Sequence, residues 1–117
     1  MDIKAIQERL ARFAAERDWD QFHSPKNLAM ALAGEAGELV EIFQWLTEEQ
    51  SAQICEKAKG RKKVEEEVAD VAIYLMRFCD KLDIDLQSAV MAKILVNEEK
   101  YPVSFAKGNA RKYTERS

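Results

Sequence analysis

The sequence predicts an all-α protein, and three observations support this. First, the 117 residues are rich in Ala, Leu, Glu and Lys and include only four Gly and two Pro, a composition that favours helices. Second, apolar residues recur at helical spacing along most of the chain, and no segment alternates as a strand would. Third, favourable N-cap residues precede several of these segments. A chain of this length buries roughly two-thirds of its unfolded surface. We therefore expect one domain, residues 1–117, built as a four-helix bundle.

Four long helices and one short one account for most of the chain. The expected helices are residues 2–18, 25–46, 48–58, 62–81 and 86–101, with a loop at 18–25, a basic loop at 57–63 and a basic, irregular tail at 103–117. The predicted N-caps are Ser24, Thr47 and Asp85. Pro25 fits the first helical position, where the missing N–H has no helical partner, and Pro102 ends the last long helix.

Two acids of the second long helix fall where a helix should be apolar. At 100° per residue, Glu35 projects into the middle of the apolar stripe and Glu38 lies at its edge, whereas Glu41 points to solvent. The stripe consists of Leu28, Leu32, Leu39, Ile42, Phe43 and Leu46. An unpaired buried carboxylate costs several kcal/mol or takes up a proton, so these two acids need a partner.

The third long helix repeats this pattern with Glu67 and Asp70. Their stripe consists of Val64, Val68, Val71, Leu75, Phe78 and Leu82. If the two helices pack together, four carboxylates converge, and hard cations such as Mg²⁺ favour oxygen ligands. A single E-x-x-E is usually only surface charge, but two such pairs on apolar faces favour a Mg²⁺ or Mn²⁺ site. A di-iron site fits less well, because such sites use Glu-x-x-His pairs and the single histidine lies in a loop.

Polar residues also interrupt the apolar stripe of the last long helix. Lys93 and Asn97 share that stripe with Leu86 and Val90. Lys93 is either a salt-bridge partner for the acids or a phosphate ligand, and Asn97 is then a hydrogen-bond partner for a sugar or base. Spacing alone leaves both interpretations open.

Four aromatic or imidazole side chains are candidates for a ligand pocket: two flank the loop before the second long helix, one closes that helix, and one follows Asp70 by a turn. They are Trp19, His23, Trp45 and Tyr74. Aromatic side chains at helical spacing more often belong to the hydrophobic core than line a ligand pocket. A flat aromatic pocket beside a carboxylate–metal cluster nevertheless suits a ligand with a ring at one end and phosphates at the other, which describes a nucleotide.

Composition and charge indicate in which cellular compartment the protein works and which classes of binding partner it lacks. The net charge of −3 gives no reason to expect nucleic-acid polymers or membranes as partners. The start "MDIKAIQERL" is not typical of a signal peptide, and no apolar run approaches the roughly 20 residues that span a bilayer. Cys55 and Cys79 lack metal-type spacing, so we expect free, buried thiols in a cytoplasmic protein.

The paired acidic motifs, E-x-x-E followed by E-x-x-D, resemble those of the MazG-like superfamily of all-α nucleoside triphosphate pyrophosphohydrolases. The segments "FAAERDWDQFHSPKNLAMALAGEAGELVEIFQW", "EEVADVAIYLMRF", "KYPV" and "RKYTE" are similar to its dCTP pyrophosphatase branch. The resemblance covers nearly the whole chain. Leu10 departs from the pattern, since the animal enzymes have a histidine there, and the segment between residues 45 and 62 is shorter; both concern base preference more than the reaction.

The resemblance implies a metal-dependent hydrolysis of a nucleoside triphosphate to the monophosphate and pyrophosphate, as nucleotide-pool house-cleaning. It implies Glu35, Glu38, Glu67 and Asp70 as Mg²⁺ ligands. It also implies substrate contacts for Trp19, His23, Trp45, Tyr74, Lys93, Asn97, Tyr101 and Lys112. Of the acids, Glu38 is our candidate general base. Trp19 and Trp45 are expected to stack the base.

Two further hypotheses concern assembly and the rival class of function. Helices this amphipathic in a small chain, together with the resemblance, lead us to expect a homodimer or homotetramer with shared active sites. The alternative to an enzyme is a helical self-association module in which the acids form interhelical salt bridges. Among enzymes, a di-metal carboxylate oxidase is the other possibility.

Overall fold

The computed structural model describes residues 1–110 and 114, and every regular element in this part of the chain is helical, which confirms the all-α prediction. The elements are α1 (Ile3–Glu16), the 3₁₀ helix η1 (Asp20–Phe22), α2 (Pro25–Phe43), α3 (Glu48–Gln53), the 3₁₀ helix η2 (Ile54–Glu56), α4 (Ala58–Lys81), α5 (Leu86–Lys100) and α6 (Val103–Ala106). They form two compact units, Met1–Asp83 and Ile84–Ser117.

A tight turn joins α1 to η1 and determines where Trp19 lies. Asp18 adopts a left-handed backbone conformation with φ of 54°, which aspartate tolerates better than most residues. The Trp19 N–H then donates to the carbonyl oxygen of Ala14 at 2.8 Å. The Trp19 ring packs edge-on against Phe13, with 5.7 Å between the ring centroids. The loop expected at 18–25 is therefore an ordered turn that contains a 3₁₀ helix.

The predicted caps of the next two helices are confirmed. The Ser24 hydroxyl accepts from the Asn27 N–H at 3.1 Å at the start of α2. Thr47 and Gln50 form the expected capping box of α3, with both reciprocal hydrogen bonds present. The α2 helix ends at Phe43, a few residues before its predicted end near residues 45–46.

The prediction of a basic loop at 57–63 is wrong, because α4 begins at Ala58 and includes this segment. Gly60 is the reason that the helix can start so early. A Cβ atom at this position would lie 2.3 Å from the carbonyl oxygen of Ile54 in η2. Only glycine allows η2 and the first turn of α4 to approach so closely. Gly60 therefore permits a close contact inside a helix and does not interrupt the helix.

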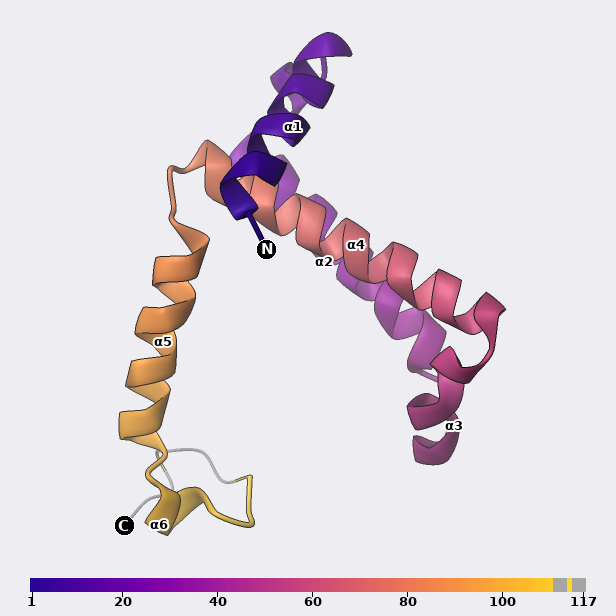
Figure 1. The fold of residues 1–117 in the computed structure, drawn as a ribbon, viewed down its shortest axis with the longest axis vertical. Coiled ribbons are helices and arrows are strands. Elements are labelled where there is room, and N and C mark those ends of the chain that lie inside the picture. Colours follow the sequence, from indigo (N-terminus) through magenta and orange to yellow (C-terminus); the bar gives the residue numbers. More distant parts are fainter. Residues whose placement is uncertain (111–113, 115–117) are drawn as a thin grey trace. The chain divides into compact units, whose positions relative to one another are not determined.

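In the first unit, α2 and α4 lie side by side and α1 packs against α4 (Figure 1). The two long helices run antiparallel, so the end of α2 faces the start of α4. The most buried apolar residues are Ala14, Leu28, Met76 and Cys79. Val68 and Leu82, which were predicted to lie in the buried stripe of α4, are 50% and 45% exposed. Both cysteines are free, as predicted, but only Cys79 is buried, and Cys55 is half-buried.

The second unit is built around α5. The Asp85 carboxylate accepts from the Ser88 N–H at 2.9 Å, which confirms the predicted cap. Lys93 and Asn97 are exposed in this structure, so the prediction that they interrupt a buried stripe is wrong for the single chain. Pro102 is followed by the short helix α6, so the prediction of an irregular tail is wrong for Val103–Ala106.

None of the helices described is both long and apolar enough to cross a bilayer.

Candidate active site

Three carboxylates converge between α2 and α4. Glu35 and Glu38 come from α2, one turn apart, and Glu67 comes from the facing side of α4. Each offers one oxygen, and these oxygens lie within 4.8 Å of one another. The sequence prediction that the two acidic motifs would meet is therefore confirmed for three of the four acids. Such a spacing of carboxylate oxygens suits a hard divalent cation.

The environment of Glu35 and Glu67 opposes their ionisation. One oxygen each of Glu35 and Glu67 is buried without a hydrogen-bond partner among the described residues. Burial, followed by a hydrogen bond with Glu38, raises the pKa of Glu35 to about 7. The pKa of Glu67 is also raised, again first by burial and then by Glu38. A cation among these oxygens would supply the missing partner and reverse this penalty.

Asp70 is not one of the three acids whose oxygens lie within 4.8 Å. It lies one helical turn beyond Glu67 on α4, and its negative charge contributes to the raised pKa values of Glu35 and Glu67. Asp70 therefore belongs to the same electrostatic neighbourhood, at its edge.

A cavity of about 220 Å³ lies beside α4, further along this helix than Glu67 and Asp70. Its walls are Leu10, Phe13, Ala14, Trp19, His23, Ile73, Tyr74 and Arg77. Three predicted ligand residues, Trp19, His23 and Tyr74, thus line one cavity. Tyr74 follows Asp70 by one helical turn, about 6 Å along the axis. The cavity is smaller than the roughly 300–1,000 Å³ of sites for drug-sized molecules, so it suits a single ring of a larger ligand.

Trp45 does not line this cavity. It lies beyond the end of α2 and is 87% exposed. The 19-residue α2 is about 28 Å long and separates Trp45 from Trp19, so one chain cannot stack a base between these two rings. Lys93, Asn97 and Tyr101 belong to the second unit, and Lys112 lies outside the described residues. These positions stay predictions.

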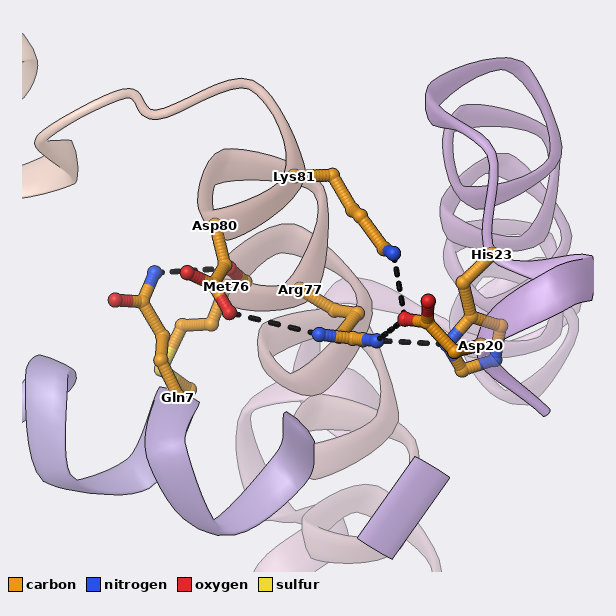
Figure 2. Close-up of polar contacts among 7 residues, drawn as sticks. All are labelled: Gln7, Asp20, His23, Met76, Arg77, Asp80 and Lys81. Carbon is orange, nitrogen blue, oxygen red and sulfur yellow. Dashed lines mark hydrogen bonds and ion pairs between the residues drawn. The ribbon is translucent and has the colours of Figure 1, made fainter. Parts of the chain in front are cut away.

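A buried arginine beside the cavity was missed at the level of sequence. Arg77 is only 5% exposed. It donates to the Asp20 carboxylate at 2.6 Å and to His23 Nδ1 at 3.2 Å, and it pairs with Asp80 at 3.5 Å. Figure 2 shows these groups converging from η1, the following loop and α4. Its spacing was a usable signal, because Arg77 follows Asp70 by seven residues and Tyr74 by three and so lies on their face.

Two further contacts complete this network (Figure 2). Lys81 Nζ also pairs with Asp20, at 2.5 Å. The Gln7 side chain of α1 donates to the Met76 carbonyl oxygen at 2.9 Å, which ties α1 to α4 next to Arg77. The Lys81 hydrogen bond is the largest factor that lowers the pKa of Asp20. Burial, followed by the charge of Arg77, lowers the pKa of His23.

Comparison with known proteins places this arrangement in a family. The chain is 43% identical over 113 residues to dCTP pyrophosphatase 1 of Rattus norvegicus, covering 97% of this chain and 66% of the rat protein. The identity to dCTP pyrophosphatase 1 of Homo sapiens is also 43%, and the alignment covers 97% of this chain and 66% of the human protein. The chain thus spans about two-thirds of the length of these curated relatives.

A solved structure and a family model agree with these relatives. The crystal structure of a pyrophosphatase from Archaeoglobus fulgidus is 41% identical and superposes with a TM-score of 0.79, covering 87% of this chain and 94% of that chain. The model of the MazG-like family matches residues 31–115, which include both acidic motifs. The chain therefore belongs to the MazG-like family.

Proposed function

We propose that this protein is a divalent-metal-dependent nucleoside triphosphate pyrophosphohydrolase, with dCTP or a modified dCTP as its substrate. The reaction adds water across the bond between the α- and β-phosphates and releases the nucleoside monophosphate and pyrophosphate. In a cell, this activity would clear nucleotides from the pool, and we expect it in the cytoplasm. The names of the relatives support the choice of dCTP.

The observation on which this proposal rests is the group of three converging carboxylates. Two buried oxygens, one each on Glu35 and Glu67, lack a hydrogen-bond partner among the described residues, which is costly unless a ligand binds there. Glu35, Glu38 and Glu67 would hold Mg²⁺ or Mn²⁺, with Asp70 at the edge of the site. When bound, the cation would neutralise charge on the triphosphate and on the leaving pyrophosphate.

The chain's own acids would also handle the proton of the attacking water. Glu38 is exposed, unlike Glu35 and Glu67, so water can reach its carboxylate. We assign Glu38 as the general base that accepts this proton, since the base must lie within hydrogen-bond reach of the water.

The cavity next to the acids would receive the nucleobase. Trp19 and Tyr74 offer aromatic surfaces, and stacking by itself tolerates any base. Selection of cytosine therefore requires hydrogen bonds, for which His23 and Asn97 are the candidates. Trp45, Lys93, Tyr101 and Lys112 are proposed to complete the substrate contacts once subunits assemble.

The proposal is tested by pyrophosphate release from the eight common NTPs and dNTPs, with Mg²⁺ and with EDTA. Wild type should turn over dCTP only with the metal. Glu35→Gln and Glu38→Gln should lose at least about a hundredfold in kcat, whereas Glu41→Gln, on the solvent side of α2, serves as the control and should be unaffected.

Other results of this assay would each change or contradict a specific part of the proposal. Equal turnover of several dNTPs would retain the reaction and remove the cytosine assignment. Full activity of Glu38→Gln would exclude Glu38 as the base. No turnover of any nucleotide would contradict the proposed function.

A further inference from the structure

The contact between Arg77 and His23 determines which nitrogen of the imidazole carries a proton. The Arg77 Nε–H lies 3.2 Å from His23 Nδ1. A guanidinium group has only donors, so Nδ1 must be the acceptor. In the neutral ring, the proton therefore lies on Nε2. The tautomer of His23 follows from this one hydrogen bond.

Arg77 is itself held in place from several sides. One terminal nitrogen pairs with Asp20 at 2.6 Å, and the other pairs with Asp80 at 3.5 Å. Lys81 pairs with the same oxygen of Asp20. A planar guanidinium with its fork fixed by two carboxylates has little freedom to rotate. The third direction of the fork, Nε–H, is therefore aimed at His23 (Figure 2).

The other nitrogen of His23 is available to a ligand. Within the described residues, Nε2 of His23 takes part in no hydrogen bond, and His23 forms part of the cavity wall together with Trp19 and Tyr74. The cavity is otherwise mainly apolar, with Leu10, Phe13 and Ile73 in its walls. A donor in such surroundings has a strong effect on which ligands bind, because an unpaired polar group there is costly.

We propose that Arg77 is a positioning residue that fixes His23 as a neutral Nε2–H donor, so that the cavity selects a ring presenting a hydrogen-bond acceptor, such as the carbonyl oxygen of a pyrimidine. This inference rests on the proposed function, because it takes the ligand of the cavity to be a nucleobase. Arg77 acts only through His23 and is not proposed to touch the substrate.

The electrostatics agree with a neutral imidazole. The charged groups around His23 are Arg77, Lys81 and Asp20. Burial and the two cations lower the pKa of His23, and Asp20 opposes them in part. The ring is therefore uncharged at neutral pH and keeps one donor and one acceptor.

The chain allows a direct test, because His23 is its only histidine. Long-range ¹⁵N–¹H NMR of ¹⁵N-histidine-labelled protein reads the tautomer without assignment and without nucleotide. Wild type should show the Nε2–H form alone at pH 7.5. Arg77→Met should give a mixture of tautomers and a raised pKa. Arg77→Lys retains a charged donor and should restore the wild-type signal in large part.

Kinetics provide the second readout. Arg77→Met should raise KM for dCTP roughly three- to tenfold, the effect of one weakened hydrogen bond, with a smaller effect on kcat. In a His23→Phe background, the same substitution should have no further effect on KM. Lys81→Met is the matched control, since it removes a cation from Asp20 without touching His23, and should retain the tautomer and KM.

Failure of this inference differs from failure of the proposed function. An Nδ1–H or a protonated ring in wild type would overturn it whatever the activity. Equal KM effects of Arg77→Met with and without His23 would overturn it as well. Absence of turnover on every nucleotide, with the Nε2–H tautomer present, would instead contradict the proposed function and the nucleobase as ligand.

Discussion

Glu35 has a titration range that reaches physiological pH, which is unusual for a glutamate. Its pKa is raised from 4.5 to about 7, because burial and the neighbouring acids penalise its charged form. A metal ion bound at the proposed site would therefore compete with protons for the same oxygens near neutral pH. The same buried carboxyl group that would bind a cation also makes the stability of the metal-free protein depend on pH.

The pH dependence of the metal-free protein follows from this shift. The folded pKa of Glu35 exceeds its unfolded value, so the folded state binds more protons between about pH 4.5 and 7. Its contribution to stability is present below that range and is lost as the pH rises through about 7. The melting temperature of Glu35→Gln should therefore exceed that of wild type by an amount that grows from pH 5 to pH 8.

Thermal melts in EDTA measure this difference, with Glu41→Gln as the control that should follow wild type. Added Mg²⁺ should raise the wild-type melting temperature more at pH 8 than at pH 6. A difference between Glu35→Gln and wild type that does not change with pH would contradict the raised pKa.

The residues of the site were predicted from sequence to different degrees. Glu35 and Glu67 followed from the helical angle alone, because an acid on an apolar stripe conflicts with its surroundings. Arg77 was missed because its partner Asp20 is 57 residues away in sequence, and only the folded turn after α1 brings the two together. Trp45 looked close to Glu38 along the chain, but α2 ends before it, and the ring is exposed.

At the scale of elements, α4 organises the first unit. The 24-residue helix contains Glu67 and Asp70 of the acidic group, then Tyr74 and Arg77 of the cavity, on one continuous face. The regular rise of the helix therefore sets the spacing between the proposed metal site and the proposed base site. The start of α4 lies far along the helix from Tyr74 and Arg77. We therefore expect a substitution there to change the stability of the protein more than its catalytic rate.

Gly60→Ala tests how α4 begins. Alanine normally stabilises a helix interior by about 1 kcal/mol relative to glycine. At Gly60 the new Cβ would lie 2.3 Å from the Ile54 carbonyl oxygen, so the backbone of η2 or α4 must move. We expect Gly60→Ala to lower the free energy of unfolding by about 1–3 kcal/mol, measured by urea denaturation.

Gly34→Ala is the matched control, because a Cβ there meets no atom within 4 Å. It should be neutral or stabilising by up to about 1 kcal/mol. If Gly60→Ala were equally stabilising, the close contact between η2 and α4 would not be a constraint on the fold.

Elements were predictable to the extent that their signals are local. Ser24, Thr47 and Asp85 act on the N–H groups of the next turn, so their caps could be read from sequence. The start of α4 could not, because a glycine among basic residues resembles a loop, and the close approach of Gly60 to Ile54 is visible only in the folded chain. Similarly, the exposure of Lys93 on α5 depends on packing that periodicity does not specify.

At the scale of the whole molecule, the first unit leaves a large apolar surface uncovered. A groove of about 480 Å³ lies between α2 and α4, at the end away from the cavity. It is lined by Leu39, Val40, Phe43, Gln44, Val64 and Val68. Val40 and Val68 are 59% and 50% exposed. Contiguous apolar surface of this kind is typical of an interface rather than of a solvated face.

This exposed apolar groove predicts that the protein assembles into oligomers. We expect the protein to be a dimer or tetramer, with a mass in light scattering that is a multiple of the 13.4 kDa chain. The double variant Val40→Glu/Val68→Glu should shift the mass toward the monomer, because it places charges on apolar surface that a partner would bury. Val103→Glu changes a 75% exposed valine outside the groove and should leave the mass unchanged.

If subunits share active sites, the double variant should also lose dCTP turnover in proportion to the monomer fraction. A wild-type mass of one chain would contradict the prediction, and full turnover by a monomeric double variant would show that each active site is complete within one chain.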